Sequence, residues 1–194
     1  MSINFVENKT INYDRVKELL EFNSRQMNLW TNNGPVKRLL EQRIKEIVLH
    51  NNSKLKENNV EVLAVSSGTA AYHTILLYYK QYKNITKWLS PAFTFATANC
   101  LPIQGIEVEL CDINSMTLTI GNNEPLIDDT QGTVITNLFG LKLDYPTRLN
   151  DRPIIFDNSA SLTTKHAFEG AMLSFGSLHH TKPLGFGEGG YIVI

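Results

Sequence analysis

The chain has 194 residues, of which 42% are hydrophobic and 19% charged, and its formal net charge is −1. This composition is ordinary for a soluble globular domain with a substantial core. A net charge so close to zero gives no electrostatic basis for binding nucleic acid or an anionic membrane, and no apolar run approaches the roughly 20 residues of a transmembrane helix. We therefore expect neither nucleic acid nor a membrane as a partner.

Two helices are expected before the first strand. Residues 12–24 form the first candidate, and a turn cluster at residues 30–35 separates it from the second. Pro35 suits the first position of that second helix. Beyond it, apolar residues recur at helical spacing from Val36 to Val48, with charged residues between them.

Strand and helix signals alternate after residue 60. Apolar runs predict strands at residues 61–66, which should be buried, and at 88–90, 108–112, 133–138, 153–157 and 191–194. Helical patterns are found at residues 68–79 and 95–103. Short strands separated by helices favour an α/β fold with a mainly parallel sheet, whose ligands bind at the carboxyl ends of the strands.

Two cysteines, Cys100 and Cys111, lie in apolar segments without the spacing of a metal site or a CxxC motif. The simplest interpretation is two buried free thiols in a reducing compartment. The first residues also lack the basic stretch and apolar core of a secretory signal peptide. Both observations predict a cytoplasmic protein.

The segment from Ser177 to Gly190 is the most informative motif and reads S-L-H-H-T-K-P-L-G-F-G-E-G-G. Its Lys182 lies between a strand end with Ser and Thr and a glycine-rich turn. An amine held in a polar pocket by such a backbone suits Schiff-base chemistry, although a surface lysine beside a hairpin is the alternative. The embedded G-x-G-x-x-G is not interpreted as a dinucleotide fingerprint, because it precedes a strand instead of opening a helix.

Two upstream segments place polar groups at strand ends. Residues 66–71, S-S-G-T-A-A, lead from a predicted strand into a predicted helix, whose free N–H groups can cradle a phosphate. A simple cap by Ser67 or Thr69 is the alternative. Asp157 ends another strand, where a buried carboxylate is costly unless it is paired; the alternative there is an Asx-turn.

Two weaker features complete the set. Residues 90–97 read S-P-A-F-T-F-A-T and place Phe95 where it could stack on a flat ring, although such a residue is more often part of the core. His179 and His180 are adjacent but show no zinc-type spacing with acidic partners. We expect no metal site, and one of these histidines is a candidate for lining the pocket.

The order of these segments resembles the DegT/StrS family of sugar aminotransferases, from about Trp30 to the end of the chain. The shared motifs are a Gly-Thr-Ala helix start, Pro-x-Phe-Thr-Phe, a strand ending in Asp, Ser-x-x-x-Thr-Lys and a Gly-Glu-Gly-Gly turn. The resemblance implies an enzyme of the aspartate-aminotransferase fold (fold type I) that uses pyridoxal 5'-phosphate (PLP). Residues 1–29 would then be an N-terminal helical segment, and residues 30–194 a three-layer PLP-binding large domain without the small C-terminal domain.

The resemblance also implies roles for individual residues. By position, Lys182 would form the Schiff base with PLP and move the proton during transamination. Asp157 would hold the pyridine nitrogen, and Phe95 would stack on the ring. The phosphate would be held by Gly68, Thr69 and Ser177.

Family membership would imply an activity and partners. The family moves an amino group from glutamate to a nucleotide-linked keto sugar, for surface polysaccharides or other glycans, and works as a homodimer with shared sites. Sugar dehydratases of the same family replace the Schiff-base lysine with histidine, so the presence of Lys182 favours transamination.

Two departures from the family pattern leave another function open. Ala160 stands where relatives usually have His or Gln, three residues after the aspartate. Relatives also continue for about as many residues again, whereas this chain stops on an apolar strand at Ile194, so we expect it to be the N-terminal part of a longer protein, or to have a separately encoded C-terminal half. The alternative function is a truncated or degenerate relative that acts as a non-catalytic binding or assembly partner.

Overall fold

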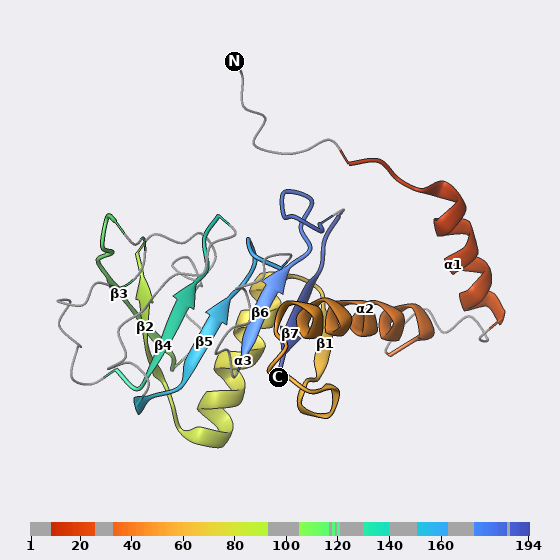
Figure 1. The fold of residues 1–194 in the computed structure, drawn as a ribbon. Coiled ribbons are helices and arrows are strands. Elements are labelled where there is room, and N and C mark those ends of the chain that lie inside the picture. The colour runs from red at the N-terminus through yellow and green to blue at the C-terminus, as the bar shows by residue number, and fades with distance from the viewer. Residues whose placement is uncertain are drawn as a thin grey trace, which may run out of the picture.

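The computed structural model describes residues 9–25, 33–92, 105–116, 118, 120, 130–139, 151–162, 173–185 and 187–194. The helices within these ranges are α1 (Tyr13–Arg25), α2 (Pro35–Asn51), the short 3-10 helix η1 (Glu57–Asn59) and α3 (Gly68–Lys83) (Figure 1). The strands are β1 (Val62–Val65), β2 (Lys87–Pro91), β3 (Glu107–Cys111), β4 (Gly132–Thr136), β5 (Ile154–Asp157), β6 (Ser174–Ser177) and β7 (Gly190–Val193).

The strands form one mostly parallel sheet in the order β1-β7-β6-β5-β4-β2-β3. Every pair from β6 to β3 is parallel, whereas β7 runs antiparallel to both of its neighbours, β1 and β6. The predicted α/β class and mainly parallel sheet are therefore confirmed. The sequence indicated β6 only through the strand end at Ser177, and it gave no indication of the direction of β7.

Helix α3 covers one face of the sheet. Its apolar residues pack on one side chain from each central strand, in a cluster of Ala71, Tyr72, Ile75, Leu76, Trp88, Val134, Ile155, Phe175 and Ile192, with Ile106. Tyr72 stacks on Phe175 with ring centroids 5.3 Å apart. Because side chains alternate along a strand, this packing assigns every second residue of β4 to β7 to the α3 face.

The opposite face is covered in part by α2. Ile44 and Val48 of α2 pack with Val62, Tyr191 and Val193 of the two strands at that end of the sheet. Figure 1 shows α2 and α3 on opposite sides of the sheet, which gives the three layers expected from the sequence. Pro35 occupies the start of α2, as predicted.

Strand β1 differs from the prediction of a buried strand. It lies at the edge of the sheet, and Leu63 is 45% exposed. The apolar run predicted burial, but no strand or helix in the described part of the chain covers Leu63, which faces outward. Glu41 of α2 partly covers this edge, since its Oε1 accepts a hydrogen bond from the Ala64 N–H at 2.8 Å.

Helix α3 is longer than predicted. It continues past residue 79 to Lys83, and Asn84 then ends it in the left-handed conformation with φ 54°. The predicted helix at residues 95–103 and Cys100 lie outside the described residues. Cys111 is a buried free thiol, as expected. None of the helices in the described ranges has the length and apolar character that crossing a bilayer requires.

Packing between β2 and β4 gives a test of the fold. A Cβ at Gly132 would lie 2.5 Å from the ring of Trp88, its fully buried partner in the sheet register. We expect Gly132→Ala to lower the free energy of unfolding by about 1–3 kcal/mol, because the ring has no free space to move into. Urea denaturation measures this loss.

The matched control is Gly187→Ala, since, apart from its chain neighbours, no heavy atom of the described residues lies within 4 Å of a Cβ built there. Its effect should stay within about 0.5 kcal/mol. Equal losses in the two variants would contradict the assigned packing of Trp88.

Candidate active site

The carboxyl ends of the parallel strands surround a cavity of about 560 Å³. Its walls come from the start of α3, the ends of β4, β5 and β6, and the turn that follows β6. The lining residues are Ser67, Gly68, Thr69, Thr136, Leu138, Asp157, Ser159, Ala160, Ser177, His179, Thr181, Lys182 and Glu188. This size is typical of pockets for small-molecule ligands.

The first turn of α3 forms one wall. Ser67 caps the helix, with its Oγ accepting a hydrogen bond from the Ala70 N–H at 3.0 Å. The N–H groups of Gly68 and Thr69 have no partner among the described residues, and the positive end of the helix dipole lies here. The capping alternative and the phosphate-cradle interpretation are compatible, because the cap uses a different N–H.

Gly68 allows α3 to approach β6 closely. A Cβ at this position would lie 2.9 Å from the Cβ of Ser177, closer than real side chains come. The Ser177 Oγ accepts a hydrogen bond from the His179 N–H at 3.1 Å, which leaves the hydroxyl proton available. Two predicted phosphate residues more than a hundred positions apart in the sequence are thus neighbours in space.

Asp157 lies at the end of β5 and is only 3% exposed. The Ser159 N–H donates to its Oδ1 at 2.9 Å, so the Asx-turn considered as the alternative is present. Burial raises the pKa of the Asp157 carboxyl above its ordinary range, and the hydrogen bonds from Ser159 and the charge of Lys182 offset only part of this rise. The carboxylate therefore lacks full compensation and favours a further cationic partner.

Lys182 lies in the turn after β6 and lines the same cavity as Asp157. The turn is closed by two main-chain hydrogen bonds, from the Lys182 N–H to the His179 carbonyl at 2.8 Å and from the Gly185 N–H to the Lys182 carbonyl at 3.0 Å. The Lys182 side chain is half-buried, and its charge acts on the pKa of Asp157. The structure thus brings together the amine and the carboxylate that the sequence singled out.

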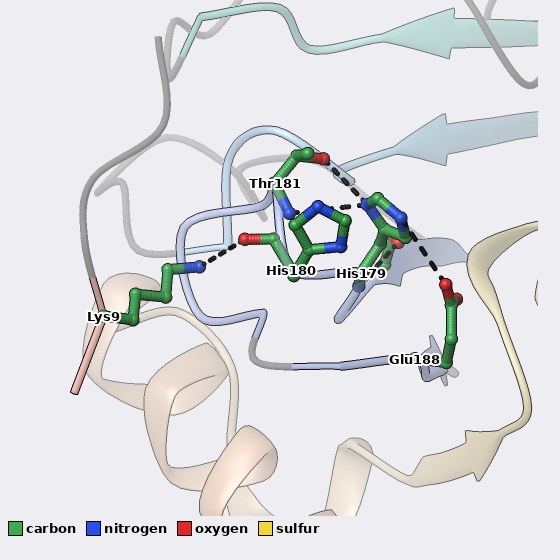
Figure 2. A network of polar contacts seen from close by, with 6 residues as sticks. Lys9, His179, His180, Thr181 and Glu188 are labelled. Atoms are coloured by element: carbon green, nitrogen blue, oxygen red, sulfur yellow. Dashed lines mark hydrogen bonds and ion pairs between the residues drawn. The ribbon is translucent and has the colours of Figure 1, made fainter. Parts of the chain in front are cut away.

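A histidine anchors the same turn from within the cavity wall. His179 Nδ1 lies 2.9 Å from the Thr181 hydroxyl, and its Nε2 lies 3.5 Å from a carboxylate oxygen of Glu188 (Figure 2). The ring of His180 packs against it with centroids 4.1 Å apart. The expectation that one of the two histidines lines the pocket is confirmed for His179.

The N-terminal segment also holds this turn. The ammonium of Lys9 donates to the carbonyl of His180 at 2.9 Å, as Figure 2 shows, and to the carbonyls of Lys182 and Gly185. A lysine ammonium has three donors, and three carbonyls of one turn take them all. No sequence pattern predicts a contact between groups more than 170 residues apart.

Five of the six residues singled out from the sequence line the cavity: Gly68, Thr69, Asp157, Ser177 and Lys182. Phe95 lies outside the described residues, so its stacking role stays a prediction. Ala160, the departure from the family pattern, also lines the cavity and offers it only a methyl group. In the described part of the chain, no three His, Cys, Asp or Glu side chains gather as a metal site.

Other residues of the wall were not predicted from the sequence, among them Thr136 and Glu188. Thr136 ends β4, but the predicted strand ran on to residue 138, so the sequence gave no sign that Thr136 stands at a strand end as Asp157 does. Glu188 had been interpreted only as part of a turn. Its pairing with His179 depends on the fold of the turn, which the sequence does not specify.

The sequence profile of the DegT/DnrJ/EryC1/StrS aminotransferase family matches residues 12–194. The chain belongs to this family. The expectation drawn from the order of the motifs is therefore confirmed, and the match extends to most of the segment before Trp30.

Solved structures share the fold. DesI, crystallised in the presence of its TDP-sugar product, matches with a TM-score of 0.75 at 22% identity over 95% of this chain and 47% of its own. The putative sugar aminotransferase Spr1654 from Streptococcus pneumoniae, in its PMP-form, matches with a TM-score of 0.76 at 19% identity over 99% of this chain and 52% of its own. A mutant of GDP-4-keto-6-deoxymannose-3-dehydratase (ColD) with bound GDP-perosamine gives a TM-score of 0.73 at 19% identity, with 97% and 50% of the chains covered. The chain spans about half the length of these proteins.

The Lys9 contacts give a testable prediction. Replacing Lys9 with Met removes three charge-assisted hydrogen bonds from the turn that carries Lys182. Such bonds each contribute about 1.5–3 kcal/mol. We expect amide hydrogen exchange in residues 179–185 to accelerate by roughly tenfold or more, because the turn opens more easily.

Lys17→Met is the matched control, since Lys17 lies on the exposed surface of α1 and loses the same charge. It should leave exchange in the 179–185 turn unchanged. Equal exchange in the two variants would show that Lys9 does not hold the turn.

The buried carboxylate gives a pH-dependent prediction. Because the pKa of Asp157 is raised in the folded chain, its contribution to stability is present at low pH and is lost as the pH rises above the ordinary carboxyl range of about 4. Without cofactor, Asp157→Asn should therefore raise the melting temperature near about pH 7. The advantage should shrink as the pH approaches about 4, where the wild-type carboxyl is also neutral.

Thermal unfolding at several pH values measures this difference. The exposed Asp151 provides the control, because Asp151→Asn should have little effect at any pH. A lower melting temperature for Asp157→Asn at neutral pH would contradict the prediction.

Proposed function

We propose that the protein containing this chain is a PLP-dependent aminotransferase that moves an amino group from glutamate to a nucleotide-linked keto-deoxysugar, in the biosynthesis of surface polysaccharides or other glycans. The observation that carries the proposal is the single cavity lined by Lys182, Asp157 and the free first turn of α3. These are an amine, a buried carboxylate and an anion site, which match the aldehyde, the pyridine nitrogen and the phosphate of PLP.

Asp157 fits the ring nitrogen. Its buried carboxylate is only partly compensated by Lys182 and Ser159, so a protonated ring nitrogen would complete its pairing. The pairing would in turn keep that nitrogen protonated. Bound PLP supplies a ring that accepts electrons from the reacting carbon.

The first turn of α3 fits the phosphate. The N–H groups of Gly68 and Thr69 are free among the described residues, and the helix dipole favours an anion there. Ser177 lies against Gly68 and can donate its hydroxyl proton. The exposed hydroxyl of Thr69 adds a further donor.

Lys182 fits the nucleophile. In its neutral form, the Nζ would attack the aldehyde of the cofactor. After a substrate amine has displaced it, the same Nζ would take a proton from the substrate carbon and return it at the next step. The turn that carries Lys182 is held by His179 and Lys9, which would limit the positions that this Nζ can reach.

The sugar substrate is supported by relatives of similar fold. DesI was crystallised with a TDP-sugar product, and ColD, a dehydratase, with GDP-perosamine. Lysine at position 182 favours transamination over dehydration, as the sequence indicated. We also propose that the protein acts in the cytoplasm as a homodimer, with residues 30–194 as its PLP-binding large domain and residues 1–29 as a helical segment.

Cofactor trapping tests the proposal. PLP added to the chain should produce a visible absorbance band, and borohydride reduction followed by peptide mapping should place the label on Lys182. L-glutamate added before reduction should bleach the band, and a nucleotide-linked keto sugar should restore it. Lys182→Met should abolish both the band and the label.

The matched control is Lys54→Met, which removes an exposed lysine that is not among the residues lining the cavity and should leave trapping unchanged. Label scattered over surface lysines would contradict a built PLP site. The protein would then be the non-catalytic binding or assembly partner considered above. A specific label on Lys182 without bleaching by glutamate would keep the cofactor and reject this amino donor.

A further inference from the structure

Thr136 is a residue of the cavity to which no role has been assigned. It ends β4, and it is the register partner of Asp157 at the end of β5. Val134 and Ile155, two residues earlier on each strand, both pack in the α3 cluster. By the alternation of side chains along a strand, Thr136 and Asp157 project from the same face, and both line the cavity.

The hydroxyl of Thr136 is buried without a partner. The residue is 6% exposed, and its Oγ1 makes no hydrogen bond within the described residues. Other buried hydroxyls share this state, among them Thr133 and Ser174, but Thr136 is the one that also lines the cavity. A buried hydroxyl without a partner costs free energy, so a group that enters the cavity and accepts its proton would remove that cost.

The residues that follow Asp157 offer no free donor to this part of the cavity, since Ser159 hydrogen-bonds Asp157 through both its hydroxyl and its N–H. Ala160 lines the cavity with a methyl group, and the Ser159 N–H already binds the Asp157 carboxylate. A cofactor ring whose nitrogen pairs with Asp157 also carries a phenolic oxygen on its edge. That oxygen requires a donor, because a phenolate buried without one is costly.

We propose that the Thr136 hydroxyl binds the phenolic oxygen of the PLP ring, and so supplies the donor that Ala160 cannot. This inference rests on the proposed function. It makes Thr136 a cofactor-binding residue beside Asp157 and accounts for an unpaired hydroxyl at this one place in the wall. A donor there stabilises negative charge on the ring oxygen.

The test compares Thr136→Val with Thr136→Ser. Valine has nearly the shape of threonine without the hydroxyl, so it should weaken PLP affinity by about tenfold. The pH midpoint of the absorbance change of bound PLP should move upward, because the phenolic oxygen loses a donor that favours its ionised form. Serine keeps the hydroxyl and should keep wild-type affinity and midpoint.

Stability without cofactor separates this role from damage to the fold. Thr136→Val removes a buried polar atom that has no partner, so the melting temperature of the cofactor-free chain should stay the same or rise. Thr133→Val is the matched control on the same strand, since its hydroxyl is also buried without a partner among the described residues but lies outside the cavity lining. It should change neither the affinity for PLP nor the pH midpoint.

A rescue variant tests the position of the donor. Ala160→Gln introduced into Thr136→Val places an amide across the cavity and should restore most of the lost affinity. The inference would be overturned if Thr136→Val and Thr133→Val had the same PLP affinity and the same pH midpoint. It would also be overturned if the rescue failed and Thr136→Val lowered the melting temperature of the cofactor-free chain. If the wild-type chain binds no PLP, both this inference and the proposed function are wrong. If it binds PLP but Thr136→Val changes neither the affinity nor the pH midpoint, this inference alone is wrong and the proposed function stands.

Discussion

The close packing of α3 against the end of β6 joins the two halves of the site. The phosphate-cradle residues precede the lysine turn by more than a hundred positions, and they meet because Gly68 has no side chain to keep it away from Ser177. The same helix carries the cluster of apolar side chains that holds one residue from each central strand. The main hydrophobic core and the anion site therefore depend on one placement of one helix, and a shift of α3 would affect both.

Electrostatics explains why the site is costly without a ligand. Asp157 is buried at a strand end, with Lys182 as a nearby charge that only partly offsets its desolvation. Burial also raises the pKa of the Tyr191 phenol, and the charge of Asp157 adds to that effect. Groups that are individually unfavourable without a partner, including the hydroxyl of Thr136, become favourable when a ligand supplies that partner. Stability and ligand binding are thus opposed at these positions.

The turn that carries Lys182 is fixed from two directions. Within the cavity wall, His179 contacts Thr181 and Glu188 and so stabilises the turn. Lys9, which is not part of the cavity lining, donates hydrogen bonds to the carbonyl groups of the turn. An amine that attacks a carbonyl and then moves a proton must reach a small set of positions, so a rigid turn suits that chemistry better than a mobile one. The N-terminal segment is therefore a structural part of the site, although it contributes no side chain to the cavity lining among the described residues.

The sequence by itself determined the alternation of strands and helices, the start of α2 at Pro35, and the lysine, aspartate and helix-start motifs that line the cavity. Those features are local, because they follow from side-chain period, proline and glycine geometry, and the chemistry of single residues at strand ends. The tertiary structure decided that β1 is a half-exposed edge strand, that β7 runs antiparallel, and that Thr136 stands beside Asp157. It also decided the contact of Lys9 with the lysine turn. These depend on which strands pair and on contacts between distant segments, and a pattern of residues along one chain does not specify either.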